Sequence, residues 1–147
     1  MHRGARKVYA VDVGHGQLAA KLRDHPQVVN MEGVNARQLT GEALAEPVDL
    51  VVIDASFIGL GKLLPGIGTW ANRGTRLLGL VKPQFEIGPA EARRARGVIR
   101  DAALRSQAIQ TVAGQLNDSG WGLLAGVDSR LFGARGNLEH FLLAVRR

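Results

Sequence analysis

The chain has 147 residues, enough for one domain with its own hydrophobic core, and it contains no cysteine. This composition excludes a disulfide framework and a thiolate metal site, and it fits a reducing compartment such as the cytoplasm. The 19 lysines and arginines exceed the 13 aspartates and glutamates, giving a net charge of +6, and no apolar run reaches the ~20 residues of a membrane helix. This positive charge favours a polyanionic binding partner. The alternative explanation is that the charge only keeps the protein soluble.

Short apolar runs alternate with helix-like segments in the first half of the chain. Residues 8–13 (VYAVDV) predict a strand, residues 17–25 a helix and residues 27–31 a second strand. Residues 48–53 and 76–81 predict two further strands, and Pro65 interrupts the helix-like stretch between them. Strands covered by helices on both faces are continuously apolar, so the alternation predicts an α/β fold with a parallel sheet.

The second half of the chain follows a different pattern. Apolar residues at helical spacing predict an amphipathic helix over residues 102–116, which the sequence Asp118-Ser119-Gly120 ends. Two strand-like runs follow at residues 121–127 and 138–147, with a loop between them. A short connection between consecutive strands makes a hairpin, so the C-terminal part of the sheet should be antiparallel. Residues 86–97 are the one segment expected to be flexible.

Charged residues stand where the predicted strands meet one edge of the sheet. Asp12, Asp54 and Lys82 lie at or directly after strand ends, and Glu139 begins the antiparallel strand that enters at the same edge. Ligands of open α/β sheets bind outside the carboxyl ends of the strands. Pro83 ends the strand and biases Lys82 towards an extended conformation. The cluster suits proton transfer or the orientation of a substrate oxygen; strand ends that simply meet water are the alternative.

The chain contains six short motifs whose order and spacing can be compared with those of known protein families. They are VYAVDVGHGQLAAKLR (8–23), NAR (35–37), PVDLVVIDASFIGL (47–60), LVKPQFEIG (80–88), GVIRD (97–101) and GNLEHFLLAV (136–145). Their order and spacing resemble the TlyA family, S-adenosylmethionine-dependent 2′-O-ribose methyltransferases of rRNA, which are sometimes labelled hemolysin A and are related to FtsJ-like enzymes. The resemblance extends over essentially the whole chain.

The resemblance implies a Rossmann-like methyltransferase sheet and a set of site residues. The family uses a Lys-Asp-Lys-Glu tetrad, whose last three members fall on Asp54, Lys82 and Glu139. Asp12 matches the acid that accepts hydrogen bonds from the cofactor ribose, and Asn35 falls in the loop beside the adenine. No metal is implied, and the scattered histidines lack the spacing of a metal site.

The start of the chain departs from the family pattern. Family members carry a small N-terminal RNA-binding domain, then the first tetrad lysine, then a first strand with a Gly-rich cofactor loop. We therefore expect residues 1–147 to form a partial FtsJ-like methyltransferase domain that lacks these parts, with a fragment, a miscalled start and a degenerate homologue as the three explanations left open. GHG at residues 14–16 follows the wrong strand to replace the loop. The strands that begin at Val8 and Val48 should then have unpaired edges.

Other features have a functional and a plainer explanation. Four arginines could bind RNA phosphates or form a solvated face; they are Arg93, Arg94, Arg96 and Arg100. Ser56 is interpreted as a helix cap rather than a nucleophile. The tryptophans and phenylalanines are expected to pack in the core or bury against helices rather than stack on bases.

The function favoured by this reasoning is 2′-O-ribose methylation of rRNA with S-adenosylmethionine as cofactor and rRNA or a ribosomal subunit, rather than DNA or a membrane, as partner. Because the cofactor loop is missing from the pattern, enzymatic activity stays open, and a catalytically inactive RNA-binding remnant is the first alternative. A membrane-active cytolysin, as the hemolysin label suggests, ranks last because no long basic amphipathic helix is evident.

Overall fold

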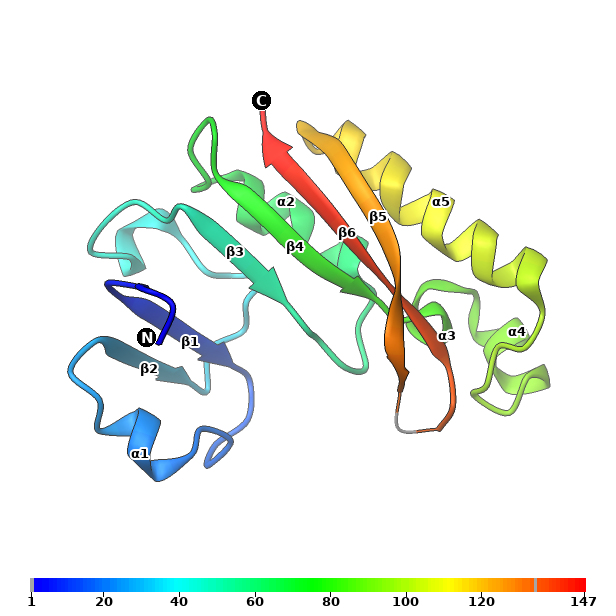
Figure 1. Cartoon of the computed structure of the whole chain (residues 1–147), viewed down its shortest axis with the longest axis horizontal. Coiled ribbons are helices and arrows are strands. Elements are labelled where there is room, and N and C mark those ends of the chain that lie inside the picture. The colour runs from blue at the N-terminus through cyan, green and yellow to red at the C-terminus, as the bar shows by residue number, and fades with distance from the viewer. Residues whose placement is uncertain (1, 134) are drawn as a thin grey trace.

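The computed structural model describes residues 2–133 and 135–147, which form two β-sheets with helices packed against them (Figure 1). In chain order the elements are β1 (Val8–Asp12), α1 (Ala20–Arg23), β2 (Val28–Glu32), η1 (Gly41–Ala43), β3 (Leu50–Ile53), η2 (Leu60–Lys62), α2 (Leu64–Gly68), β4 (Arg76–Val81), α3 (Pro83–Glu86), α4 (Pro89–Arg94), α5 (Ala102–Asp118), β5 (Trp121–Phe132) and β6 (Leu138–Arg146).

The larger sheet has the strand order β3-β4-β6-β5, and the smaller one pairs β1 with β2. β1 and β2 are parallel, as are β3 and β4. β6 runs antiparallel to both of its neighbours, so β5 and β6 form the predicted C-terminal hairpin. The α/β fold class and the mixed sheet are therefore confirmed. The hairpin is longer than predicted, because β5 continues to Phe132 instead of ending near residue 127.

In the part of the chain that the structure describes, no strand of the smaller sheet pairs with a strand of the larger sheet. Among the described residues, β1 pairs only with β2 and β3 pairs only with β4, which confirms the predicted unpaired edges. β1, β3 and β4 all point the same way in Figure 1, so their carboxyl ends face the same side of the molecule. This common direction places the strand-end residues of both sheets along one side.

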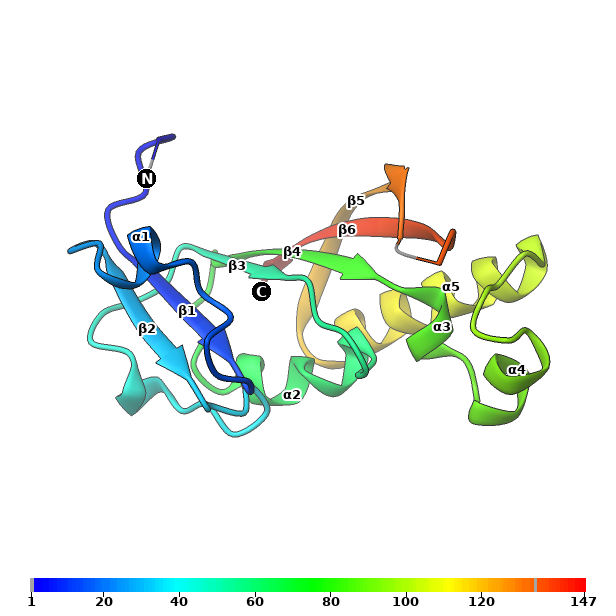
Figure 2. The same cartoon turned by 90° about the horizontal axis from the view of Figure 1, so that it is seen from below.

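The hydrophobic core lies on one face of the larger sheet. Figure 2 shows α2 and α5 on that face. β4 contributes Leu77 and Val81, both fully buried, and α5 contributes Val112 and Leu116. Gly79 lets η2 approach β4 closely, because a Cβ atom there would lie 2.5 Å from the Leu60 side chain. The core therefore fixes β4, the strand that leads to Lys82.

Capping and turn residues explain the ends of α5. The Asp101 carboxylate accepts hydrogen bonds from the backbone N–H groups of Ala103 (2.7 Å) and Leu104 (3.2 Å), as an N-cap does. The helix ends just before Gly120, which adopts a φ of +79° that favours glycine. α5 thus starts directly after the GVIRD motif, whose Asp101 is its N-cap, and follows the segment that carries the four arginines.

Two local expectations were wrong. The helix predicted over residues 17–25 forms only at Ala20–Arg23. Pro65 does not interrupt a helix; it stands in the first turn of α2, where its missing N–H breaks no hydrogen bond. Residues 86–97 contain the short helix α4, and the flexibility expected of this segment stays a prediction.

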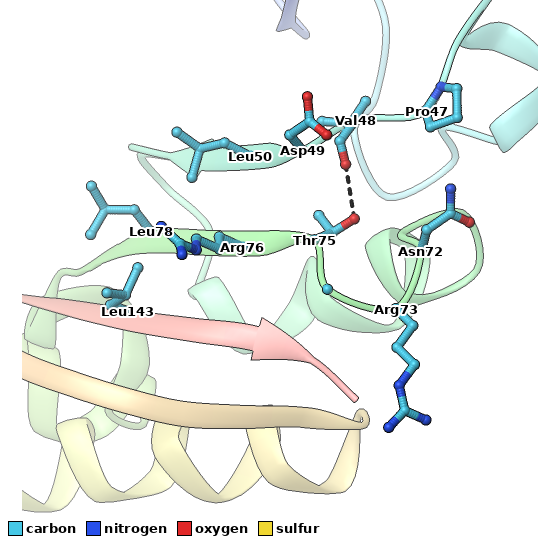
Figure 3. Close-up of a pocket in the computed structure, with 11 residues that line it drawn as sticks. Pro47, Val48, Asp49, Leu50, Asn72, Arg73, Thr75, Arg76, Leu78 and Leu143 are labelled. Atoms are coloured by element: carbon cyan, nitrogen blue, oxygen red, sulfur yellow. Dashed lines mark hydrogen bonds between the residues drawn. The ribbon is translucent and has the colours of Figure 1, made fainter.

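The other face of the larger sheet is apolar and open in the described part of the chain. Leu50, Val52 and Val127 are 51%, 64% and 63% exposed. A depression of about 620 Å³ lies at the amino ends of β3 and β4. Figure 3 shows residues that line it, among them Thr75, whose hydroxyl donates to the Val48 carbonyl (2.8 Å). This depression lies at the opposite end of β4 from Lys82, so the cluster of charged residues lies elsewhere.

Candidate active site

Lys82, Asp54 and Ser56 meet at the carboxyl ends of β3 and β4. The Lys82 Nζ lies 2.7 Å from the Asp54 Oδ1 and donates a hydrogen bond to the Ser56 Oγ at 3.0 Å. The Lys82 side chain is only 12% exposed, whereas that of Asp54 is 67% exposed. The lysine side chain is therefore largely buried, whereas its carboxylate partner Asp54 faces solvent.

Local sequence explains the position of Lys82. It has extended backbone angles (φ −108°, ψ 101°) directly before Pro83, which starts α3. A residue before proline is biased towards this conformation, and Pro83 has no N–H to continue the strand ladder. β3 and β4 pair in parallel with Ile53 opposite Gly79, and the same register continued by three residues brings Ser56 level with Lys82.

Glu139 stands on the neighbouring strand β6, at the register position opposite Lys82. Val81 pairs with His140 in the antiparallel ladder, so the next pair in register is Lys82 with Glu139. Directly opposite residues project from the same face of a sheet. Glu139 is 8% exposed, and its carboxylate lies against Gly133, where a Cβ atom would be 2.5 Å from Oε1. The register therefore places a buried carboxyl group opposite Lys82, while among the described residues the ion pair of Lys82 is made with Asp54.

A second set of contacts fixes the loop after Asp54 against α3. The Glu86 Oε1 accepts a hydrogen bond from the Leu60 N–H at 2.6 Å. Burial of this carboxyl group raises the pKa of Glu86 above its usual range. Phe57 and Phe85 pack with their ring centroids 5.7 Å apart. The segments that carry Asp54 and Lys82 therefore cannot move independently without breaking these contacts.

Ser56 and Phe57 differ from the sequence-based interpretation. No helix follows Ser56 directly, since η2 begins at Leu60 with Gly59 as its N-cap, so Ser56 is not a helix cap and instead contacts Lys82. Phe57 was expected to be buried, yet it is 92% exposed and has a φ of +66°. A positive φ is an outlier for a bulky residue and occurs most often at functional sites.

Asp12 and Asn35 lie at the smaller sheet, where both make turns. The Asp12 Oδ1 accepts a hydrogen bond from the Gly14 N–H at 2.7 Å, and the Asn35 Oδ1 accepts one from the Arg37 N–H at 3.0 Å. Asp12 pairs with Glu32 in register at the carboxyl ends of β1 and β2. These two candidates thus belong to one edge of the smaller sheet and not to the Lys82 cluster.

The loop after β1 is organised by Glu32. Its Oε1 accepts hydrogen bonds from the backbone N–H groups of Gln17 (2.6 Å) and Leu18 (3.0 Å). These bonds, led by that from Leu18, lower the pKa of Glu32 to about 2. The sequence offered no specific signal for this role, because an acid at the end of a strand is common.

The four arginines lie on and after α4, and all of them are exposed. Arg94, Arg96 and Arg100 line a depression of about 630 Å³ together with Asp101. Within residues 2–133 and 135–147, none of the four arginines forms a salt bridge. Their positive charge therefore faces solvent, where a polyanion can reach it.

None of the helices among the described residues is both long and apolar enough to cross a bilayer. The same residues contain no group of three or more His, Asp or Glu side chains arranged to hold a metal ion.

Solved structures identify the class of the fold. An S-adenosylmethionine-dependent methyltransferase from Listeria monocytogenes superposes with a TM-score of 0.67 over 99% of this chain and 83% of its own, at 13% sequence identity. Two possible hemolysins superpose much more closely, each with a TM-score of 0.94 over 99% of this chain. The protein from Streptococcus thermophilus is 33% identical and is covered over 52% of its length; that from Lactococcus lactis is 31% identical and covered over 70%. The fold is therefore that of a Rossmann-like methyltransferase.

The chain belongs to the FtsJ-like methyltransferase family, whose model matches residues 1–147. It is 45% identical over 142 residues to the 16S/23S rRNA (cytidine-2′-O)-methyltransferase TlyA of Mycobacterium tuberculosis, covering 97% of this chain and 53% of that protein. It is 35% identical to hemolysin A of Brachyspira hyodysenteriae, covering 97% of this chain and 61% of that protein. The chain thus spans little more than half the length of these relatives.

Proposed function

We propose that this chain is the catalytic region of an S-adenosylmethionine-dependent enzyme that methylates ribose 2′-hydroxyl groups of rRNA. The observation that carries the proposal is the Lys82 ammonium, held by Asp54 (2.7 Å) and Ser56 (3.0 Å), with the buried carboxyl group of Glu139 opposite it in strand register. The family membership and the rRNA methyltransferase names of the relatives support the same reaction.

In this proposal the chain's own residues hold the nucleophile. Lys82 donates a hydrogen bond to the ribose 2′-oxygen or, as an amine, removes its proton, and Asp54 keeps the Lys82 side chain in place. Glu139, together with Asp54, fixes the position and protonation of the ribose hydroxyl. S-adenosylmethionine supplies the methyl group. A reactive oxygen held in one orientation lowers the barrier mainly through proximity.

The residues described here match one end of the cofactor. The Asp12 carboxylate at the end of β1 is exposed and suits a ribose, with Asn35 beside the adenine as a further proposed contact. The glycine turns of the smaller sheet follow β1 (Gly16) and β2 (Gly33), and the His15 ring occupies the space beside Gly33, so the turn after β2 leaves no room there for a cofactor. A close backbone approach to the rest of the cofactor needs a glycine turn. We therefore infer that residues 1–147 are a partial domain, and that a further strand and its loop complete the cofactor site.

The proposed partner is rRNA or a ribosomal subunit in the cytoplasm. Four exposed arginines provide the phosphate contacts; they are Arg93, Arg94, Arg96 and Arg100. Such contacts position RNA without reading its sequence, and the 2′-hydroxyl distinguishes RNA from DNA. The four arginines and the residues around Lys82 therefore both favour RNA as the substrate.

The test is methyl transfer from labelled S-adenosylmethionine to ribosomal subunits, with the 147-residue chain and with an N-terminally extended chain. Methylation of a 2′-oxygen protects the adjacent phosphodiester from alkali, so label should be recovered in alkali-resistant dinucleotides. Label on bases instead would refute ribose methylation. The extended chain carrying Lys82→Met should transfer no methyl group, and full activity of that variant would refute the role given to Lys82.

An RNA-binding protein without catalysis is the second candidate, and the break between β1 and β3 favours it. Isothermal titration separates the two candidates. An extended chain that binds RNA but not S-adenosylmethionine would support the second candidate and reject the first.

A further inference from the structure

Asn137 is a buried amide that joins two distant parts of the chain. It is 2% exposed and lies in the connection between β5 and β6. Its Oδ1 accepts a hydrogen bond from the Ile99 N–H at 2.8 Å, and its Nδ2 donates one to the Gly97 carbonyl at 2.8 Å. Both donor and acceptor of the side chain are therefore used on one short backbone segment.

These hydrogen bonds close a long excursion of the chain at its base. The excursion leaves the sheet at Val81, which pairs with His140 on β6. It passes through α3 and α4 (Figure 1) and returns at Gly97 to Ile99, where Asn137 holds it three residues before His140. Its two ends are thus attached to the same short stretch of the hairpin, and Lys82 is its first residue.

The excursion carries several positive charges. Arg93, Arg94 and Arg96 lie within it, and Arg100 follows directly after it. Arg135 approaches from the hairpin side, where a Cβ atom on Gly97 would be 3.4 Å from the Arg135 Nη1. Asn137 therefore binds the backbone next to this group of arginines, and Glu139 follows it two residues later in the chain.

We propose that Asn137 is a positioning residue that fixes the arginine-bearing segment 93–100 at one distance and orientation from the Lys82–Asp54–Glu139 cluster. A phosphate bound by the arginines would then place one particular ribose over Lys82. The inference rests on the proposed function for its substrate, an RNA strand, and on the two hydrogen bonds of Asn137 for its geometry.

The chemistry of the contact explains why an amide is needed. A buried carbonyl and a buried N–H must both be satisfied, and among side chains of this size the carboxamide offers a donor and an acceptor together. Asn137→Asp keeps the acceptor but directs a carboxylate at the Gly97 carbonyl. Asn137→Leu has a similar volume and makes neither bond. The two variants should therefore release the segment to different degrees, with leucine the greater.

The first experiment measures the geometry directly. The chain has no cysteine, so spin labels can be attached at Arg93→Cys on α4 and Val52→Cys on β3, both exposed positions. Electron–electron distance measurements should give one narrow distribution in the labelled parent and a broader or shifted one in Asn137→Leu. An unchanged distribution in a folded Asn137→Leu or Asn137→Asp variant would overturn the proposal.

A matched control tests whether any lost internal hydrogen bond has this effect. Thr75 is 3% exposed and donates its hydroxyl to the Val48 carbonyl at the other end of β4. Thr75→Val should leave the label distances unchanged; equal broadening would mean that Asn137 is merely structural. Hydrogen exchange of the unmodified chain needs no variant: the Ile99 amide should exchange as slowly as the amides of the β4–β6 ladder, and fast exchange would refute the contact.

The second experiment measures RNA binding at stepped salt concentrations with a single-stranded fragment of rRNA. Asn137→Leu should weaken binding by at least threefold and flatten the salt dependence, since released arginines contact fewer phosphates together. Unchanged affinity alongside a broadened distance distribution would reject the positioning role. A parent chain that binds no RNA would refute the proposed function, and the distance measurement would still decide whether Asn137 fixes the segment.

Discussion

Replacing Lys82 by Met separates a chemical role from a structural one. The ion pair with Asp54 is formed at a rim where the Asp54 side chain is 67% exposed, so it contributes about 1 kcal/mol or less to the free energy of unfolding. Met keeps the apolar stem of the lysine, and Asp54 stays solvated when its partner is lost. We therefore expect the melting temperature to fall by no more than about 2–4 °C.

The effect on methyl transfer should be far larger. A positioned acid–base group contributes about 10²–10⁴-fold to a rate. The assay is methyl transfer in the N-terminally extended chain, with thermal unfolding measured on the same preparation. Lys21→Met is the matched control, since Lys21 is exposed on α1 and makes the same change of charge. A fall of 10 °C or more in Lys82→Met, with activity lost only in proportion to unfolding, would refute the chemical role.

Three further predictions follow from other features. Neutralising Arg93, Arg94, Arg96 and Arg100 together should weaken binding to unrelated RNAs alike and lower the slope of log K against log salt; an unchanged slope would return these residues to a solvated face. The pKa of Glu32 is lowered from 4.5 to about 2, so its contribution to stability is complete above pH 4.5 and is lost as the pH falls towards 2; in Glu32→Gln, acid unfolding monitored by circular dichroism should lose this dependence. The 147-residue chain should bind S-adenosylmethionine far more weakly than an extended chain does, and tight stoichiometric binding by the short chain in calorimetry would contradict the partial cofactor site.

Apolar runs allowed most of the sheet to be predicted. The strand at residues 76–81 was predicted with its observed bounds, because it is buried on alternate residues by α2 and α5 and ends at Pro83. The proximity of Asp54 and Lys82 followed from the rule that parallel strands end at one edge. That rule depends only on strand direction, which the alternation of strands and helices already indicates.

Side-chain partners within loops could not be predicted in the same way. Ser56 contacts Lys82 because the register of β3 and β4 continues beyond the strands, and sequence alone does not reveal register. Phe57 is exposed because its backbone turns to a positive φ, for which a phenylalanine gives no signal. Asn137 binds residues 38 and 40 positions away, a separation at which local pattern carries no information.

The separation of the two sheets has a consequence for how the proposed activities depend on one another. Lys82, Asp54 and Glu139 all belong to the larger sheet, whose core is closed by α2 and α5. Asp12 and Asn35 belong to the smaller sheet, which shares no strand pairing with the larger one in the described residues. Contacts within the larger sheet therefore maintain the proposed substrate side of the site, whatever the state of the proposed cofactor side. Changes on β1 and β2 should alter cofactor affinity while leaving the geometry around Lys82 and the affinity for RNA intact.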